Sequence, residues 1–553
     1  MDSSNTSDAD TLQANQLEKS EKNSIPDSGS DANNEITAAD QSEFVSGYQL
    51  FLLVFATSMA GFLYALDVNI IVTAIPVITT HFKTIKDIGW YGSAYLLTLC
   101  ACSPIIGKIY QFYNSKITFF IFVFIFEVGS LVCAIAPTST ALVIGRAVAG
   151  FGGSGLFSGG LTIIGASLPP AKRAQTVALV YVFSMTGSIV APLIGGVLTE
   201  KASWRWCFYI NLPLGAIALT IITFIRIPER RAKIEKKPTL YETVNRLDPV
   251  GFALFSPACI MVLLALQWGG STYAWNSSTI VGLFVGSALT LPVFIFWEKR
   301  RGEMAMIPLS LFTQRVVYSS CLVAFFQYGA LLIFAYYLPV WFQTILGVNP
   351  LKSGAYFMAT AAPLITATLA SGILGKKIGT PTIYTLVGNA IAMIGGGLMT
   401  TFKPSSSTGV WVGYQILAGL GRGLVNQQPI NAVQYTLDHS KMAVGTSLVV
   451  FSQFFGGALI LALAETDFSS SLRSTLKEYA PSVDPALVVA AGATGIRKAV
   501  TSEQLPGVLK AYNQAVTNTF ILGCAASGVA FLAAWGMGLK RTKKSEPTAP
   551  GEA

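Results

Sequence analysis

The sequence has little charge and almost no histidine. Only 12% of its 553 residues are charged, against about 25% in an average soluble domain, which excludes an ordinary soluble enzyme. The two histidines, His81 and His439, fall in expected loops, so an enzyme inside a membrane is not expected either. The seven cysteines show no Cys-x-x-Cys spacing, which supports neither a disulfide framework nor a zinc site. No phosphate-binding loop (GxxxxGK followed by Ser or Thr) occurs, and we expect no metal and no other cofactor.

The charge that is present is unevenly placed. Residues 1–47 hold ten acids and two lysines, whereas the other 506 residues share 18 acids and 35 bases. The first segment is too poor in apolar residues to offset the entropy of ordering, and it lacks the apolar core of a signal peptide, so we expect a disordered tail. Basic charge that binds nucleic acid clusters beside aromatics on a polar surface, but here it stands between long apolar runs. We therefore expect the lipid bilayer as a partner, and no nucleic acid.

Fourteen segments carry the roughly 20 mainly apolar residues that are needed to cross a bilayer core. An even number places both termini on one side of the membrane. The segments are approximately residues 48–76, 89–107, 117–136, 138–165, 175–198, 207–226, 249–268, 279–298, 315–346, 353–375, 381–402, 409–437, 442–466 and 516–539.

Lys and Arg are concentrated in one set of alternate connections. This set and the end of the chain hold 22 basic residues, and the opposite short connections hold six. Because basic residues resist translocation, both termini are expected in the cytoplasm. On the other side, Asn276-Ser277-Ser278 forms a glycosylation sequon in an expected outside loop.

The two halves of the chain repeat the same local patterns. Residues 106–108 (Ile-Gly-Lys) return 268 positions later as Leu-Gly-Lys, and residues 149–152 (Ala-Gly-Phe-Gly) return 269 positions later as Ala-Gly-Leu-Gly. Parallel repeats of six helices are typical of secondary transporters. We expect an all-α integral membrane fold of two six-helix bundles plus two inserted central helices. The expected regions are a tail at 1–47, a bundle at 48–226, a cytoplasmic linker with the two inserted spans at 227–314, a bundle at 315–540 with an extracellular loop at 467–515, and a cytoplasmic tail at 541–553.

Five motifs resemble one transporter family. They read LDVNIIVTAIP at 66–76, GRAVAGFGG at 145–153, GSIVAPLIGG at 187–196, WRWCFYINLP at 204–213 and LQWGG at 266–270. These motifs resemble the major facilitator superfamily, in particular its fourteen-span drug:proton antiporter branch and, within that branch, fungal toxin efflux pumps. The resemblance implies a major facilitator fold and a monomeric, proton-coupled carrier at the plasma membrane. Its partners would be protons and an amphipathic small molecule, such as a fungal toxin, a secondary metabolite or a drug, which it would export.

Asp67 and Arg146 are ionisable residues well inside expected spans, where a charge costs roughly 2.5–3.5 kcal/mol on insertion scales. Asp67 lies nine residues before Pro76 at the outer end of its span, and Arg146 lies eight residues after Thr138 at the outer start of its own. With a rise of 1.5 Å per residue the two sit at similar depth, so we expect them to pair. Burial favours the neutral carboxyl and Arg146 favours the charged one, so a change of access would load or release a proton. A purely structural ion pair is the alternative.

Glu127 lies near the middle of the third span. We interpret it as a second proton site or a contact for cationic substrates, the alternative being a protonated side chain bonded to a backbone carbonyl. In the repeat, Gln415 is the counterpart of Arg146, and Arg422 falls opposite Gly153. The halves have lost their charge symmetry, which suggests that proton coupling resides in the first half.

Glycines in the fifth span lie on both sides of a proline. Gly187, Gly195 and Gly196 let helices approach closely, and Pro192 permits a bend. Gating is the functional interpretation, and close packing is the structural one.

Polar and aromatic side chains of two later spans are candidates for a substrate cavity. Gln427, Asn431 and Gln434 stand at i, i+4 and i+7, on one face of the twelfth span. Gln327 and Tyr336 belong to the ninth span, in a stretch suited to flat apolar ligands. The alternatives are interhelical hydrogen bonds for the amides and a place in an aromatic belt for Tyr336.

Two other functions remain open from the sequence. One is an uptake or vacuolar carrier for siderophores or basic amino acids, located in the vacuolar membrane. Cationic ligands would require more acids than Asp67 and Glu127. The other is a transport-inactive membrane sensor, against which the retention of Asp67 and Arg146 at matching depth argues.

Overall fold

A computed structural model describes residue 45 and residues 47–83, 87–225, 227, 240–270, 272–378, 380–485, 487–488, 495–497 and 499–538. The chain separates into two units, Met1–Ser46 and Gly47–Ala553, and the fold below is that of the second unit. The expected tails at 1–47 and 541–553 lie outside the described residues, apart from Val45 and Gly47.

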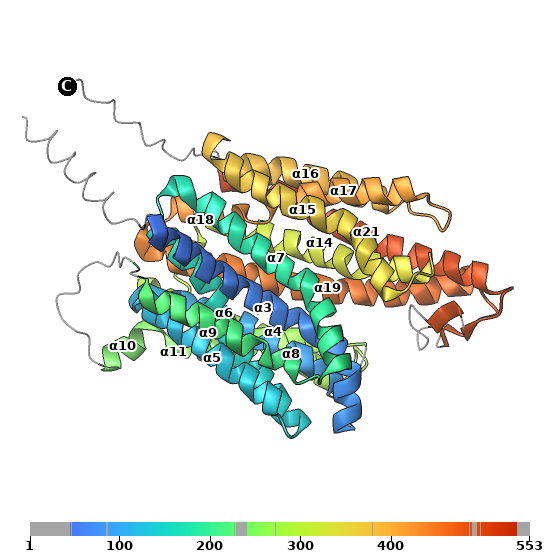
Figure 1. Cartoon of the computed structure of the whole chain (residues 1–553), viewed down its shortest axis with the longest axis horizontal. Coiled ribbons are helices and arrows are strands. Elements are labelled where there is room, and N and C mark those ends of the chain that lie inside the picture. Colours follow the sequence, from blue (N-terminus) through green and yellow to red (C-terminus); the bar gives the residue numbers. More distant parts are fainter. Residues whose placement is uncertain are drawn as a thin grey trace, which may run out of the picture. The chain divides into compact units, whose positions relative to one another are not determined.

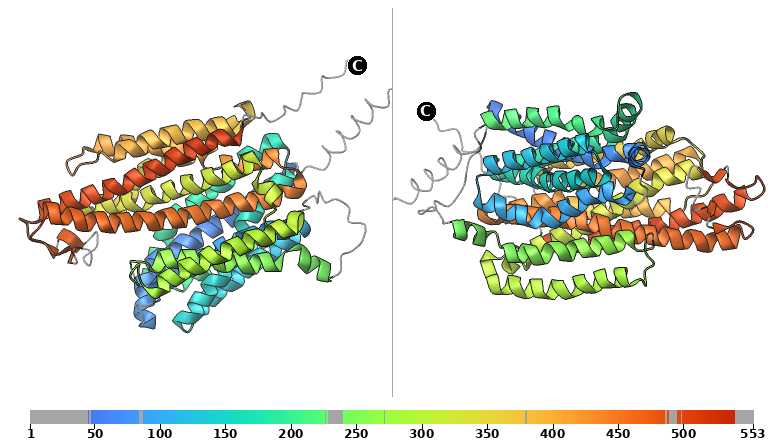
Figure 2. Two further views of the ribbon diagram at one scale, coloured as in Figure 1. Left: turned by 180° about the vertical axis from the view of Figure 1, so that it is seen from behind. Right: turned by 90° about the horizontal axis from the view of Figure 1, so that it is seen from below.

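The second unit is built from long helices that run roughly alongside one another (Figures 1 and 2). Within the described ranges the only β pairing is an isolated bridge between Gly269 and Tyr273, so the all-α prediction is confirmed. The long helices are α3 (Gly47–Phe82), α4 (Ile88–Phe112), α5 (Ser115–Ile135), α6 (Ser139–Ser167), α7 (Pro170–Lys201), α9 (Asn211–Phe224), α11 (Pro249–Trp268), α12 (Ser278–Arg301), α14 (Arg315–Thr344), α15 (Pro350–Ile378), α16 (Pro381–Met399), α17 (Thr408–Val425), α19 (His439–Tyr479) and α21 (Leu505–Ala534).

Shorter helices connect or extend these. They are α8 (Trp206–Tyr209), α10 (Leu240–Arg246), η1 (Gly302–Met304), α13 (Leu309–Phe312), α18 (Gln428–Thr436) and η2 (Trp535–Met537).

Thirteen helical segments of the described chain are long and apolar enough to cross a membrane. The remaining expected span, 409–437, is divided into α17, which ends at Val425, and α18, which begins at Gln428. Pro429 accounts for the break, because proline has no N–H and its ring clashes with the carbonyl four residues earlier, on Val425. The expectation of one continuous helix over this stretch was wrong.

Helices α19 and α21 are also longer than the sequence suggested. The expected loop at 467–515 begins inside α19 and ends inside α21, which leaves only residues 480–504 between them. Leu472 and Leu476 of α19 are buried in one cluster with Ala511 of α21, and Thr475 Oγ1 donates to the Ala511 carbonyl at 3.0 Å. The loop boundaries were wrong because the polar residues around these leucines belong to the exposed face of an amphipathic helix.

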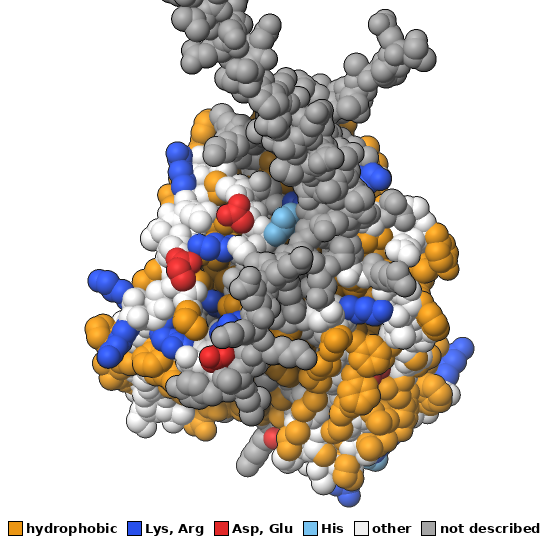
Figure 3. All heavy atoms as spheres, turned by 90° about the vertical axis from the view of Figure 1, so that its left-hand side faces the viewer, with side chains coloured by type: hydrophobic (Ala, Val, Ile, Leu, Met, Phe, Trp, Pro, Cys, Tyr) orange, Lys and Arg blue, Asp and Glu red, His pale blue; other side chains and the backbone are white. Residues whose placement is uncertain are grey.

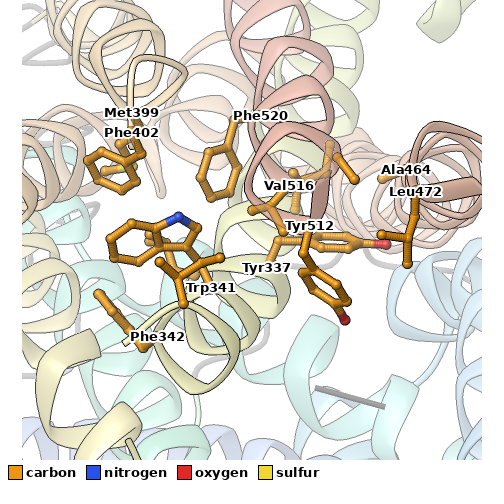
Figure 4. Close-up of a cluster of buried hydrophobic side chains, with 14 of the residues drawn as sticks. Tyr337, Trp341, Phe342, Met399, Phe402, Ala464, Leu472, Tyr512, Val516 and Phe520 are labelled. Carbon is orange, nitrogen blue, oxygen red and sulfur yellow. The ribbon is translucent and has the colours of Figure 1, made fainter. Parts of the chain in front are cut away.

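Two sets of six long helices form separate bundles. In the first, α3, α4, α5, α6, α7 and α9 pack on one another, and in the second α14, α15, α16, α17, α19 and α21 do so. A cluster of buried aromatic and aliphatic side chains occupies the core of the second bundle (Figure 4). At its centre Trp341 is fully buried and donates Nε1 to Asn513 Oδ1 at 2.7 Å.

The bundles repeat the same close packing between their third and fourth long helices. A Cβ on Gly129 of α5 would lie 2.6 Å from Ala149 Cα of α6, and a Cβ on Gly395 of α16 would lie 2.6 Å from the Ala418 backbone N of α17. Only glycine permits such an approach. The local sequence repeat therefore corresponds to a repeat of packing.

The bundles meet along two helix pairs, α4 with α19 and α7 with α15. A Cβ on Gly107 of α4 would lie 2.8 Å from Ser447 Cβ of α19, and Ser447 Oγ lies 3.0 Å from Ser158 Oγ of α6. On the second pair, a Cβ on Gly372 of α15 would lie 2.5 Å from Ala178 Cβ of α7. We call this contact between the bundles the seam.

The inserted helices α11 and α12 lie beside the first of these pairs, since α11 packs on both α4 and α19. Glu303, directly after α12, reaches both bundles. Its carboxylate lies 2.9 Å from Lys441 Nζ of α19, and its backbone carbonyl accepts a hydrogen bond from Lys108 Nζ of α4 at 3.3 Å.

Candidate functional site

Asp67 and Arg146 are in contact inside the first bundle. Arg146 Nη1 of α6 lies 2.5 Å from Asp67 Oδ2 of α3, and both side chains are fully buried, at 1% and 0% exposure. Arg146 Nε donates to the Tyr91 carbonyl of α4 at 2.8 Å. Three helices thus hold the pair, and its geometry is that of a charge-assisted hydrogen bond.

A third polar group belongs to this site and was missed from the sequence. Asn211 Nδ2 donates to Asp67 Oδ1 at 2.8 Å and lies 3.1 Å from Ser130 Oγ of α5. Asn211 begins α9, and Pro213 explains why α9 starts there, because the proline ring clashes with the carbonyl of Tyr209, the last residue of α8. The polar residue ahead of a proline within an otherwise apolar stretch was the available signal.

Glu127 lies beside this site, one turn before Ser130 on α5. Its side chain is mostly buried, and neither carboxylate oxygen has a hydrogen-bond partner among the described residues. Gly215 of α9 faces it, since a Cβ there would run into the Glu127 carboxylate and lie 3.0 Å from its Cγ. The carboxyl group therefore occupies space that only a glycine leaves free.

An aromatic cluster joins the two bundles close to the Asp67 site. The ring of Phe454 from α19 lies 5.6 Å from Tyr64 of α3, 6.0 Å from Phe157 of α6 and 5.8 Å from Tyr328 of α14, between ring centres. Tyr181 of α7 completes the cluster, 5.5 Å from Phe157. The sequence analysis did not select these five residues, because they come from five different helices. We call them the central aromatic cluster.

Tyr95 of α4 stands between the ion pair and this cluster. The Arg146 guanidinium lies 4.5 Å from the centre of the Tyr95 ring, and that ring lies 6.4 Å from Tyr64. Asp67 is three residues from Tyr64 on α3, about one turn along the helix. The charged pair and the aromatic rings are therefore in physical contact.

The amides expected on one face of the twelfth span point to different partners. Gln427 precedes α18, and its Nε2 donates to Ser371 Oγ of α15 at 3.1 Å. Asn431 Nδ2 contacts Gln428 Oε1 at 3.4 Å. Gln434 crosses the seam, donating Nε2 to the Leu161 carbonyl of α6 at 2.9 Å. The three follow the break and belong to one helical stretch, since the Asn431 backbone N–H donates to the Gln427 carbonyl at 3.1 Å, but their amides bond different neighbours.

The two candidates of the ninth span differ in burial. Gln327 is buried, and its Nε2 has no hydrogen-bond partner in the described part of the chain. Tyr336 is 58% exposed. Among the described residues, the Tyr336 ring makes no contact with a ring of the central aromatic cluster.

The expected gating residues of α7 lie mainly against α3. A Cβ on Gly187 would lie 2.7 Å from the Phe62 carbonyl, and one on Gly195 would lie 2.7 Å from the Ile70 carbonyl. A Cβ on Gly196 would meet nothing within 4 Å, and Pro192 is exposed. The first two glycines are thus required by packing inside the first bundle.

Arg422, in the second bundle, is buried in different surroundings. Its guanidinium lies 3.9 Å from the centre of the Phe334 ring, and its Nε and Nη2 have no hydrogen-bond partner among the residues described. Gln415, the counterpart of Arg146, accepts a hydrogen bond from Thr360 Oγ1 at 3.0 Å.

A helical membrane protein with two repeated six-helix bundles and a buried ion pair in one of them has the architecture of a secondary transporter. The sequence model of the Major Facilitator Superfamily matches residues 57–461, and the chain belongs to this family, as its motifs predicted.

Relatives and a solved structure agree with this assignment. The chain is 44% identical to the MFS-type transporter pigP of Monascus ruber, over 92% of this chain and 90% of the relative. It is 45% identical to the efflux pump mlcE of Penicillium citrinum, over 92% and 93%. Its fold is similar to that of the proton:xylose symporter XylE, with a TM-score of 0.58, 12% identity and coverage of 88% of this chain and 95% of the symporter.

Proposed function

We propose that this transporter is a proton-coupled antiporter that exports flat, amphipathic small molecules, such as a fungal secondary metabolite or toxin. It works as a monomer in the plasma membrane with both termini in the cytoplasm. The observation that carries the proposal is the contact of the buried Asp67–Arg146 pair, through Tyr95, with aromatic rings from both bundles.

The proton step follows from the surroundings of Asp67. A charged carboxylate without solvent contact is stable only with a partner, and Arg146 is that partner. When Asp67 takes up a proton, its attraction to Arg146 falls. The guanidinium is then free to shift toward the Tyr95 ring, 4.5 Å away, whose face also attracts a cation.

Substrate binding follows from the central aromatic cluster. Aromatic pairs attract flat apolar molecules by stacking and edge contacts. The cluster contains no carboxylate, but Tyr181 Oη lies 3.1 Å from Gln453 Oε1 and offers a polar group beside the rings. This composition favours an amphipathic compound over a basic amino acid.

Proton and substrate act on one another through Tyr95. A shift of Arg146 disturbs the Tyr95 ring, which adjoins Tyr64 of the cluster. Loading a proton therefore changes the shape of the substrate site. Such a coupling is reciprocal, so a bound substrate changes the affinity for the proton by the same factor.

The distribution of basic residues supports the orientation. Figure 3 views one end of the molecule, where several Lys and Arg side chains lie. Helix α12 ends in the basic residues Lys299, Arg300 and Arg301. Basic connections remain in the cytoplasm. The opposite end carries Asn276, which is exposed, and we propose that it is glycosylated.

Export as the direction of transport rests on the relatives. The Penicillium citrinum relative is named an efflux pump and is 45% identical over nearly its whole length.

Flux measurements in proteoliposomes test the proposal. Rhodamine 6G, a flat amphipathic dye, would be added outside vesicles whose interior is more acidic than the bath. Antiport predicts that the dye accumulates as protons leave, and that nigericin, which collapses the pH difference, stops the accumulation. Protein-dependent flux that is equal with and without the pH difference would contradict proton coupling. The natural substrate is sought by comparing the compounds secreted by deletion and overexpression strains.

A further inference from the structure

Asn211 is the second group that holds Asp67. Arg146 Nη1 bonds one carboxylate oxygen at 2.5 Å, and Asn211 Nδ2 donates to the other at 2.8 Å. Asn211 is fully buried. As a neutral amide, it orients the carboxylate and favours its charged form without adding a second positive charge.

The same amide group also reaches α5. Asn211 Nδ2 donates to Ser130 Oγ at 3.1 Å. An amide nitrogen carries two hydrogens, so Asp67 and Ser130 together use both. Ser130 is fully buried, and because its oxygen accepts from Asn211, its own hydroxyl hydrogen remains available to donate.

Glu127 lies about one helical turn from Ser130 on α5. It is three residues before Ser130, and Gly215 is four residues after Asn211, so each pair shares one helix face. Helices α5 and α9 pack together (Figure 1), and Gly215 leaves the space that the Glu127 carboxylate fills. Both Glu127 oxygens are buried without a hydrogen-bond partner among the described residues.

We propose that Asn211 is a positioning residue that fixes the orientation of the Asp67 carboxylate and ties it to Ser130 of α5, one helical turn from the buried Glu127 carboxyl. The inference rests on the proposed proton coupling and deepens it. Because Asn211 bonds the charged form of Asp67, it helps to set the proton affinity of this carboxyl.

Other titratable groups lie around Asp67 and Glu127. Apart from Arg146, they are of types that carry no charge near neutral pH. They come from the helices packed against Asp67 and are Tyr95 of α4, Cys133 of α5 and Cys207 of α8.

Carbodiimide labelling tests the inference without a substrate. The reagent attacks protonated carboxyl groups in apolar surroundings. The full-length protein, purified into lipid nanodiscs, would be labelled between about pH 4 and 10, which spans the usual carboxyl range with room for large shifts. Mass spectrometry of the peptides that contain Asp67 and Glu127 then gives a labelling midpoint for each residue.

Three variants give distinct expectations. Asn211→Leu removes both donated hydrogen bonds, and the Asp67 midpoint moves up by about one pH unit or more, a tenfold or larger change in proton affinity. Ser130→Ala removes only the hydrogen bond that holds Asn211 to α5, so the Asp67 midpoint moves in the same direction but by less than in Asn211→Leu. Asn513→Leu is the matched control, since Asn513 is a buried asparagine that bridges Trp341 and the Phe402 carbonyl in the other bundle. It moves neither midpoint.

An unchanged Asp67 midpoint in Asn211→Leu overturns the positioning role. Should that variant not fold, the smaller change Ser130→Ala decides, and an unchanged Asp67 midpoint there overturns the positioning role. Failure of the proposed function looks different, because wild-type rhodamine 6G flux would then ignore the pH difference whatever the labelling shows. A shift of the pH optimum of flux in Asn211→Leu, absent in Asn513→Leu, supports the inference through transport.

Discussion

Arg146 and Arg422 are both buried in the fourth long helix of their bundles, yet among the described residues only Arg146 is paired with a carboxylate. Arg146 lies 2.5 Å from Asp67, whereas Arg422 lies 3.9 Å from the centre of the Phe334 ring. An aromatic face holds a desolvated cation by about 2 kcal/mol, without introducing a group that titrates near neutral pH. The comparison teaches that one bundle holds its buried arginine with a carboxylate, whereas the other holds it against an aromatic ring.

Gln415, the uncharged counterpart of Arg146, lies in similar surroundings. Gln415 and Thr360 of the second bundle lie 269 positions after Arg146 and Tyr91. Arg146 bonds the Tyr91 carbonyl, and Gln415 bonds the Thr360 side chain at 3.0 Å. In the second bundle a neutral amide thus makes the contact between α17 and α15 that the arginine makes between α6 and α4 in the first. These helices therefore pack together without an ion pair.

Asp67→Asn should have the largest effect. The amide cannot carry a proton in exchange, so pH-driven rhodamine 6G flux should fall to the background of empty vesicles. The variant should still fold, because the Asn oxygen can accept from Arg146 and the guanidinium also lies 4.5 Å from the centre of the Tyr95 ring. Arg422→Met, which removes the buried charge of the second bundle, should leave the flux measurable. Full pH-driven flux in Asp67→Asn would remove Asp67 from the mechanism.

Arg146→Met and Arg422→Met should differ strongly in stability. Removing Arg146 leaves Asp67 buried without its cation, which costs about 3–5 kcal/mol of the free energy of unfolding. Removing Arg422 leaves no carboxylate unpaired among its described contacts, and an apolar replacement of a buried charge is neutral or stabilising. Denaturant titration of the purified variants measures both. Equal losses would mean that Arg422 has a partner like that of Arg146.

Gly152→Ala and Gly421→Ala should have similar effects. A Cβ on Gly152 would run into the Phe126 backbone N, and one on Gly421 would run into the Ala392 backbone N. Overpacking of this kind costs about 1–3 kcal/mol, in each bundle alike. The measurement is thermal unfolding of both variants, and a large loss in only one would show that the two packings are not equivalent.

Lys441→Ala should have the smallest effect. Lys441 and Glu303 are 35% and 61% exposed at a separation of 2.9 Å, so solvent screens the pair and it contributes about 0.5 kcal/mol or less. The loss should disappear at about 1 M salt, where the Debye length is about 3 Å. A larger loss that salt does not reduce would show that this link between the inserted helices and the second bundle is buried in the working protein.

Apolar length and depth were sufficient to predict most of the long helices and the contact of Asp67 with Arg146. The two residues lie at similar depth and carry opposite charge, and the structure places them in contact. Their role in proton coupling stays a prediction. The same arithmetic could not locate Asn211, because the position of a polar side chain at a helix start depends on where Pro213 breaks the chain.

Local pattern misled where a helix was polar or broken. The stretch around Leu472 and Leu476 was taken for a loop, although its apolar face is buried against α21. The stretch 409–437 was taken for one continuous helix, although Pro429 interrupts it. The first error arises from a contact with another helix, and the second from a local break that hydropathy does not register.

The sequence by itself determined the membrane location of the helices, the repeat between the two halves and the presence of intramembrane charge at Asp67, Glu127, Arg146 and Arg422, because apolar length, local repeats and charge can be read along the chain. Only the tertiary structure decided which side chains share a site. The central aromatic cluster takes Tyr64, Phe157, Tyr181, Tyr328 and Phe454 from five helices, and Asn211 meets Asp67 across 144 positions of the chain. Such contacts depend on how helices rotate and pack against one another, which no periodicity within a single helix specifies.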